Sequence, residues 1–124
     1  MELSQYFKSI IDQDLSAVVI CDTGHTILYM NPAATARYAR RGGEKLLGRN
    51  LLECHAPQSQ ELIRKAVSWF VESEDHNILY EAHNDAENRD TYIVALRDAD
   101  GELIGYYEKH EFRNRETKLF YDFT

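Results

Sequence analysis

The sequence has only two cysteines and no long apolar run, and both shortages restrict its class. Two cysteines, Cys21 and Cys54, are too few for the disulfide framework of a small secreted domain. No apolar stretch approaches the roughly 20 residues that a membrane-spanning helix needs. The N-terminus, MELSQYFKSI, also lacks the apolar segment of a signal peptide. We therefore expect a cytoplasmic protein that does not enter a membrane.

Basic residues are scarce as well. Lysine and arginine number 14 against 21 aspartates and glutamates, and the net charge is -7. Proteins that bind nucleic acid usually carry a basic face. The nearest approach to one here is Arg37, Arg40 and Arg41, which we place at a helix end, where the helix dipole favours cations. Nucleic acid is therefore not an expected partner.

Motifs for catalysis and metal binding are missing. We find no nucleophile placed beside a base, no phosphate-binding loop and no cluster with the spacing of a zinc site. The neighbours Cys54 and His55 point in different directions on a turn or helix, so they make a poor catalytic pair. Glu108 and His110 share one face of a strand but have no third ligand. We expect neither an enzyme nor a metal site.

The residues that are present fit one domain with a segment at either end. Residues 1–13 place their apolar side chains at helical spacing, which predicts a short amphipathic helix. So short a helix needs a surface to lie on, either its own sheet or a second copy of the chain. The domain itself is assigned to residues 14–113, and residues 114–124 are left as a tail of unpredicted structure.

Within residues 14–113, strands flank a helical middle. Asn31 and Pro32 are typical of a helix start, and that helix is expected to end at Gly42–Gly43. A longer helix is expected from Pro57 to about Ser73. The expected strands are 17–22, 26–31, 76–83, 91–98 and 102–112. Strands at both ends with helices between them predict an α+β domain with an antiparallel sheet.

Three stretches in this order resemble a PAS domain. They are AVVICDTGHTILYMNPAA at 17–34, LLGRN at 46–50 and LRDADGELIGYYE at 96–108. The resemblance implies a five-stranded antiparallel sheet, helices on one face and a small-molecule pocket between them. PAS domains are sensors or dimerisation modules in signal transduction and transcription regulation, usually attached to an effector. No effector is present, so we expect a stand-alone protein or a piece of a longer signalling protein.

The stretch GRNLLECH at 48–55 bears on the ligand. It resembles GRNCRFLQ of the flavin-binding light sensors, but Leu51 occupies the position of the reactive cysteine. Cys54 lies about one helical turn further on, where a thiol would not meet the same flavin atom. Haem-binding relatives supply a histidine from the long central helix, and here that helix has none. Cys54 or His55, just before it, leaves a haem-binding redox or gas sensor as an alternative.

The resemblance also indicates residues that line the pocket. In flavin-binding relatives a polar pocket residue lies two positions after a glycine of the last strand; after Gly105, that position is Tyr107. Alternation along the preceding strand turns Thr91 and Ile93 inward as well. The candidate ligand-binding residues are therefore Cys54, His55, Thr91, Ile93 and Tyr107.

The same alternation turns Tyr92, Val94 and Leu96 outward, so both faces of the sheet are apolar and need cover. The N-terminal helix of a second copy is a suitable cover, which predicts a homodimer. Its interface residues would be Leu3, Tyr6, Phe7, Ile10 and Ile11. The leading hypothesis is thus a cytoplasmic PAS sensor that binds a small molecule and relays through this interface. The alternative from another class is a ligand-free dimerisation module with a filled core.

Overall fold

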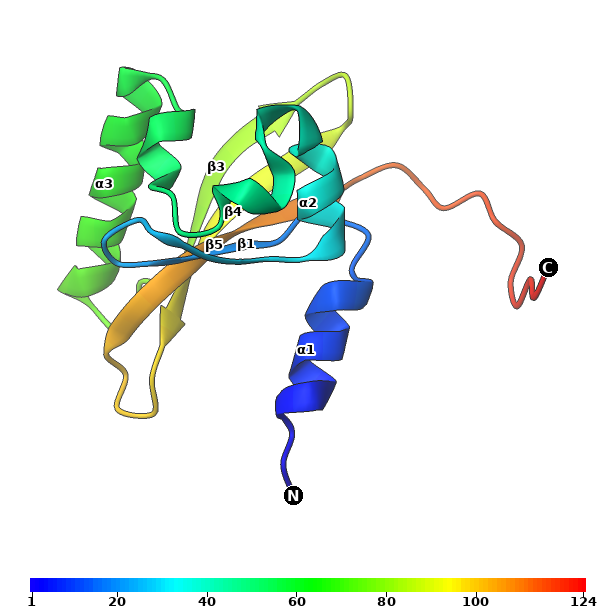
Figure 1. Ribbon diagram of the computed structural model, residues 1–124, viewed down its shortest axis with the longest axis horizontal. Helices are drawn as coiled ribbons and strands as arrows, with labels where there is room; N and C mark the ends of the chain where they lie inside the picture. Colours follow the sequence, from blue (N-terminus) through cyan, green and yellow to red (C-terminus); the bar gives the residue numbers. More distant parts are fainter.

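The computed structural model describes all 124 residues and contains a five-stranded antiparallel sheet in the order β2-β1-β5-β4-β3 (Figure 1). The strands are β1 (Val19–Asp22), β2 (Ile27–Met30), β3 (Ile78–Asn84), β4 (Arg89–Arg97) and β5 (Leu103–Phe112). The α-helices are α1 (Ser4–Gln13), α2 (Pro32–Arg37) and α3 (Pro57–Glu72), and the 3₁₀ helices are η1 (Ala39–Arg41), η2 (Gly43–Leu46) and η3 (Leu51–Cys54). The predicted α+β architecture is confirmed.

The core lies between one face of the sheet, called here the inner face, and the helices from α2 to α3. Helix α3 contributes Ile63, Ala66 and Phe70, which recur at helical spacing and are almost completely buried. The inner face contributes Cys21 and Tyr106, both of them inaccessible to solvent. These side chains come from strands near both ends of the sequence and from α3 in its middle, and together they form one apolar core.

Asn31 starts α2 and joins it to the segments around it. Its side-chain oxygen accepts a hydrogen bond from the Ala34 N–H, which is the helix cap that the sequence predicted, and a second one from the Val18 N–H. Its amide group donates to the carbonyl oxygens of Ile11 and Ser16. Asn31 is fully buried, so this one side chain fixes the position of α1, β1 and α2 relative to one another.

The end of α3 is held by Arg97 of β4. One guanidinium nitrogen, Nη2, lies 2.7 Å from the Phe70 carbonyl oxygen, 3.0 Å from that of Ser73 and 3.1 Å from that of His76. The last carbonyls of a helix have no partner within the helix, and a cation placed there satisfies them. Arg97 thereby anchors α3 to the sheet.

Helix α1 extends away from the domain and buries none of its residues (Figure 1). Its C-terminal end is attached through Ile11, whose carbonyl oxygen accepts from Asn31, and through Asp12, which accepts from the Tyr29 hydroxyl. The apolar side chains toward the other end are open to solvent, with Tyr6 61% and Phe7 58% exposed. The tail beyond β5 forms no helix or strand and also extends away from the sheet.

Candidate functional site

A partly open cavity of about 80 Å³ lies between the inner face of the sheet and the short helices. Its walls are mostly apolar, and three charged or polar side chains, Arg41, His55 and Glu108, line it together with the thiol of Cys54. The other lining residues are Val19, Ile27, Met30, Tyr38, Leu46 and Leu51. An apolar chamber with a few polar groups is the usual character of a small-molecule site.

An open, polar cleft adjoins this cavity. Glu108, Tyr38 and Arg41 line both, so the two spaces meet at these side chains. The cleft is otherwise lined by Arg37, Glu81, Ala82, Arg89, Thr91 and His110. Together the two spaces form one candidate site, with an apolar interior and a charged mouth.

The sequence placed five residues at this site, and the structure brings three of them to it. Cys54 and His55 line the cavity, where η3 ends, and Thr91 lines the cleft. Ile93 faces inward as predicted but is 3% exposed and belongs to the packed core rather than to either space. No bound molecule is present, so ligand binding by these residues stays a prediction.

Tyr107 is not at the site, and its predicted inward orientation is wrong. It lines a groove on the outer face of the sheet, together with Ile20, Leu96 and residues of α1. The reason is a bulge near the turn that joins β4 to β5. Leu96 pairs with Gly105 but Arg97 pairs with Leu103, so β5 contains one extra residue at this point. A shift of one residue moves every following side chain to the other face. Tyr106, next to Tyr107, therefore faces inward.

The bulge also sets which residues of β5 face the site. Thr91 pairs with His110 and Ile93 with Glu108, so both partners face inward with them. Glu108 and His110 were predicted to share one strand face, but neither was predicted to line the pocket. Their signal was available in the inward assignment of Thr91 and Ile93, since paired residues of an antiparallel sheet share a face.

Glu108 lies between two histidines. Its Oε1 is 3.9 Å from His55 Nε2, and its Oε2 is 3.8 Å from His110 Nε2. Both distances are too long for hydrogen bonds. The other ring nitrogen of His55, Nδ1, lies 3.0 Å from the Leu51 carbonyl oxygen, which fixes the ring at the cavity wall. The Nδ1 atom of His110 is buried and has no hydrogen-bond partner.

Glu81 reaches the cleft through a second bulge. In the β3–β4 pairing Tyr80 opposes Tyr92 and Ala82 opposes Thr91, so Glu81 is the extra residue. Glu81 is exposed as a whole residue, and it lines the cleft. Partial desolvation and then the charge of Glu108 raise the pKa of Glu81 to about 7, against a smaller opposing effect of Arg89.

A different polar group lies deeper, on β5. The Tyr106 hydroxyl is 2.8 Å from His25 Nδ1, and the two rings meet edge to face. Burial, with the neighbouring Cys21, raises the pKa of Tyr106, and burial raises the pKa of Cys21 to about 12. Cys21 is 1% exposed. Both groups stay neutral and serve the core.

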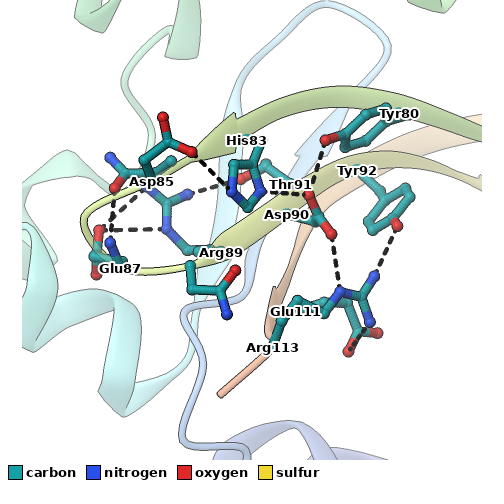
Figure 2. A network of polar contacts seen from close by, with 12 residues as sticks. Tyr80, His83, Asp85, Glu87, Arg89, Asp90, Thr91, Tyr92, Glu111 and Arg113 are labelled. Atoms are coloured by element: carbon teal, nitrogen blue, oxygen red, sulfur yellow. Dashed lines mark hydrogen bonds and ion pairs between the residues drawn. The ribbon is translucent and has the colours of Figure 1, made fainter.

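A second polar cluster surrounds Asp90 at the far end of β3 and β4 (Figure 2). Its carboxylate accepts from the Tyr80 hydroxyl, contacts His83 Nδ1 and accepts from Arg113 Nε, each at 2.8 Å. Arg113 also donates to the Tyr92 hydroxyl. The Arg113 guanidinium, followed by His83 and Tyr80, holds the pKa of Asp90 well below its usual range. This cluster ties the residue just after β5 to the sheet.

The cavity, as distinct from the open cleft beside it, admits only a group much smaller than a macrocycle. Pockets for drug-sized ligands measure about 300–1,000 Å³, against about 80 Å³ for this cavity. His55 is held through Nδ1 by a backbone carbonyl, and its Nε2 faces Glu108. No group of three or more histidine, cysteine, aspartate or glutamate side chains is arranged to hold a metal ion.

These features define the class of the protein: an α+β module whose antiparallel sheet carries helices and a small cavity on one face. A family model described as the PAS fold matches residues 11–109. The chain belongs to the PAS family, as the resemblance predicted. No curated protein matches the sequence. No helix combines the length and the apolar character that crossing a membrane requires.

Solved structures of PAS domains are similar to the whole fold. A PAS domain from Colwellia psychrerythraea is 15% identical, with 90% of this chain and 97% of that chain covered and a TM-score of 0.67. The PAS domain of BvgS from Bordetella pertussis is 15% identical, with 90% and 86% covered and a TM-score of 0.64. The Aer2 receptor of Vibrio cholerae, a dual PAS-haem oxygen sensor, is 17% identical, with 79% and 94% covered and a TM-score of 0.58. At these identities the likeness concerns the fold alone.

Proposed function

We propose that this PAS domain is a sensor in cytoplasmic signal transduction and does not act as an enzyme. A small ligand would occupy the cavity and its cleft. The observation that carries the proposal is the position of Glu108, which lines the apolar cavity and the polar cleft at once. A molecule with a small apolar part and a polar group would span the two and contact Cys54 or His55 at one end and Thr91 at the other.

Native mass spectrometry of the protein purified from cells tests this proposal. We expect a mass above that of the 124-residue chain, lost on denaturation, from a retained small molecule. As a second measurement, NMR spectra of the protein before and after denaturing dialysis and refolding should differ in the amide signals of Glu108 and His110. An unchanged spectrum together with an unmodified native mass would contradict ligand binding and favour a ligand-free dimerisation module.

The signal would pass through α1 to a homodimer interface. Leu3, Tyr6, Phe7 and Ile10 are exposed, and an exposed apolar surface of this kind is typical of an interaction site. A groove of the outer face, lined by Ile10 and Ile11 of α1 and by Ile20, Leu96 and Tyr107 of the sheet, lies beside it. A second α1 laid along this groove would cover both apolar surfaces.

Sedimentation velocity of the whole chain tests the interface. Phe7→Ser with Ile10→Ser should convert a dimer into a monomer, because it removes apolar area that only a partner would bury. Gln5→Ser with Gln13→Ser makes the same kind of change on the polar side of α1 and should leave the dimer intact. A monomeric wild-type chain, or a dimer that survives the apolar substitutions, would reject this interface.

A haem-binding redox or gas sensor is the remaining candidate, and the likeness to the Aer2 fold is what favours it. Its ligand would have to come from His55 or Cys54, since α3 contains no histidine. The small cavity weighs against it. Addition of hemin should therefore produce no shift of its main absorption band. A shift that His55→Ala or Cys54→Ala abolishes would replace the small-ligand proposal.

A further inference from the structure

A carboxylate and two imidazole rings lie in a row where the cavity meets the cleft. Glu108 Oε1 is 3.9 Å from His55 Nε2, and Glu108 Oε2 is 3.8 Å from His110 Nε2. All three side chains are shielded from solvent, with 24% of His55, 16% of Glu108 and 3% of His110 exposed. The row joins two layers of the fold, because Glu108 and His110 belong to β5 and His55 to the connection between η3 and α3.

The hydrogen bond of His55 decides which of its ring nitrogens carries the proton. Its Nδ1 lies 3.0 Å from the Leu51 carbonyl oxygen. A carbonyl oxygen can only accept, so Nδ1 must donate, and in the neutral ring Nε2 is left without a proton. Nε2 therefore presents an electron pair to the Glu108 carboxylate. Two acceptors that face each other repel, and the gap of 3.9 Å, too long for a hydrogen bond, fits this assignment.

The ring of His110 is placed in the opposite way. Its Nδ1 is buried without a hydrogen-bond partner, while its Nε2 faces Glu108. With the proton on Nε2, the neutral ring directs a donor toward the carboxylate. A second proton, on Nδ1, would create a buried N–H group without an acceptor, which is costly. Of the two rings, His55 is therefore the one that gains a hydrogen bond to Glu108 when it takes up a proton.

The other groups around His55 offer a charged ring no acid to pair with. Arg41 of η1 lines the cavity, and its guanidinium donates to the Cys54 carbonyl oxygen. The hydroxyl of Tyr38 and the thiol of Cys54 belong to the same wall, and β1 and β2 contribute only apolar side chains. The cleft beyond Glu108 adds Arg37, Glu81, Arg89 and His110. Glu108 is thus the one carboxylate that lines the cavity with His55, and a nearby opposite charge favours the charged ring.

We propose that His55 and Glu108 form a pH-operated latch between the helical layer and the sheet. When His55 takes up a proton at Nε2, the two facing acceptors become a charge-assisted hydrogen bond. Such bonds measure about 2.7–2.9 Å, so the gap of 3.9 Å closes by about 1 Å. Histidine changes its charge between about pH 5 and pH 8, which makes the latch responsive in the physiological range.

Closing the latch acts on the shape of the candidate site. His55 lies just before α3, and Glu108 lines both the cavity and the cleft. The new hydrogen bond therefore draws the start of α3 toward β5 and narrows the place where the two spaces meet. The latch needs no ligand, so it goes beyond the proposed sensor function and does not depend on it.

NMR of the wild-type chain between pH 8 and pH 5 tests the latch. At pH 8 the ring nitrogens should show the Nδ1–H form of His55 and the Nε2–H form of His110. At pH 5 a signal of His55 Nε2–H, protected from exchange with water, should appear, and the NOE between the His55 ring and the Glu108 side chain should strengthen. A proton on His55 Nε2 at pH 8, or a charged His55 without the protected signal, would overturn the proposal. No variant is involved, so misfolding cannot mask the result.

Variants then identify the partner of His55. Glu108→Met keeps the length of the side chain but removes both acceptor oxygens, so the protected signal at pH 5 should be lost. Glu61→Met makes the same change at an exposed position of α3 and should keep the signal. Glu81→Gln should keep it too; this control is needed because the pKa of Glu81, at about 7, lies in the same pH range.

The outcomes for the latch and for the ligand are separate. A protected signal that survives Glu108→Met, or one that disappears in Glu81→Gln, would reject the pair of His55 and Glu108 even if native mass spectrometry finds a retained small molecule. A signal that depends on Glu108 alone, in a chain of unmodified native mass, would support the latch while contradicting the proposed ligand.

Discussion

The side-chain amide of Asn31 donates to the Ile11 carbonyl oxygen at 2.9 Å, so the cap of α2 is also the attachment point of α1. The same side chain accepts from the Val18 N–H, just before β1. A movement of α2, which borders the candidate site, would therefore be transmitted directly to α1 through the Asn31 side chain. In the proposed sensor, Asn31 is where a change in the cavity would enter the dimer interface.

We expect Asn31→Ala to lower the free energy of unfolding by about 3 kcal/mol. The estimate combines about 1 kcal/mol for a lost cap with about 1–3 kcal/mol for the buried Val18 N–H, which is left without a partner. Asn31→Ser keeps a capping oxygen but is too short to reach the Ile11 carbonyl, so it should recover about 1 kcal/mol. Urea denaturation of the three proteins measures these differences. Equal stabilities of the serine variant and the wild type would contradict the role of the amide donor.

A second expected effect concerns the close approach of β1 and β5. A Cβ atom added to Gly105 would lie 2.1 Å from the Cys21 carbonyl oxygen, a contact that the paired strands cannot relieve without separating. Gly105→Ala should therefore cost about 1–3 kcal/mol, the usual penalty of overpacking. Gly48→Ala is a useful comparison, because its backbone is in the left-handed region but nothing lies near its added Cβ. Thermal unfolding of both variants separates steric from backbone effects.

The sequence was sufficient for the fold because the local signals agreed with one another. Asn31 and Pro32 marked the start of α2, and Pro57 marked that of α3. Each strand carried the apolar pattern and each hairpin the turn residues that such elements need. The signal for the N-terminal helix was equally direct: its apolar stripe predicted residues 1–13, and α1 occupies Ser4–Gln13.

The site was predicted less well because side-chain direction depends on register, and register depends on bulges. One extra residue in β5 exchanged Tyr107 for Tyr106 at the inner face, and another in β3 brought Glu81 into the cleft. No residue type announces the bulge in β3, whereas the bulge in β5 adjoins Gly105, and a glycine inside a strand is a bulge signal that the prediction did not use. The polar contacts of the cleft also join residues far apart in the chain, such as Arg37 and Glu87, which spacing along the sequence cannot reveal.

The two cysteines should differ sharply in reactivity. Burial raises the pKa of Cys21 to about 12, so it is almost entirely a thiol at pH 8, whereas Cys54 is half-buried at the cavity. The thiolate is the reactive form. A thiol-specific reagent at pH 8 should therefore label one cysteine per native chain and none in Cys54→Ala until denaturant is added. Rapid labelling of two cysteines in the native protein would contradict the packing around Cys21.

The Asp90 cluster should hold the residue that follows β5. Asp90→Asn removes the charge that Arg113 contacts, so amide hydrogen exchange at Arg113 should become faster and the melting temperature should fall. The pKa of Asp90 is lowered in the folded state. Its contribution to the free energy of unfolding is therefore present above the pKa of the unfolded chain and is lost as the pH falls. Asp85→Asn, a fully exposed neighbour that contacts only His83, should leave exchange at Arg113 unchanged.

Glu81 should make the stability of the folded protein depend on pH in the direction opposite to that of Asp90. Its pKa rises from an ordinary value of 4.5 to about 7 in the folded state. Between these values the folded protein keeps a proton that the unfolded chain has lost, so stability decreases as the pH rises and levels off above pH 7. Glu81→Gln removes this group and should melt at a higher temperature than the wild type at pH 8.

At pH 4, where the carboxyl group is mostly protonated in both states, the two proteins should melt at nearly the same temperature. Differential scanning calorimetry from pH 4 to pH 8 follows the change, with Glu61→Gln as the exposed control. A difference between wild type and Glu81→Gln that is independent of pH would show that the Glu81 carboxyl is not desolvated in the cleft.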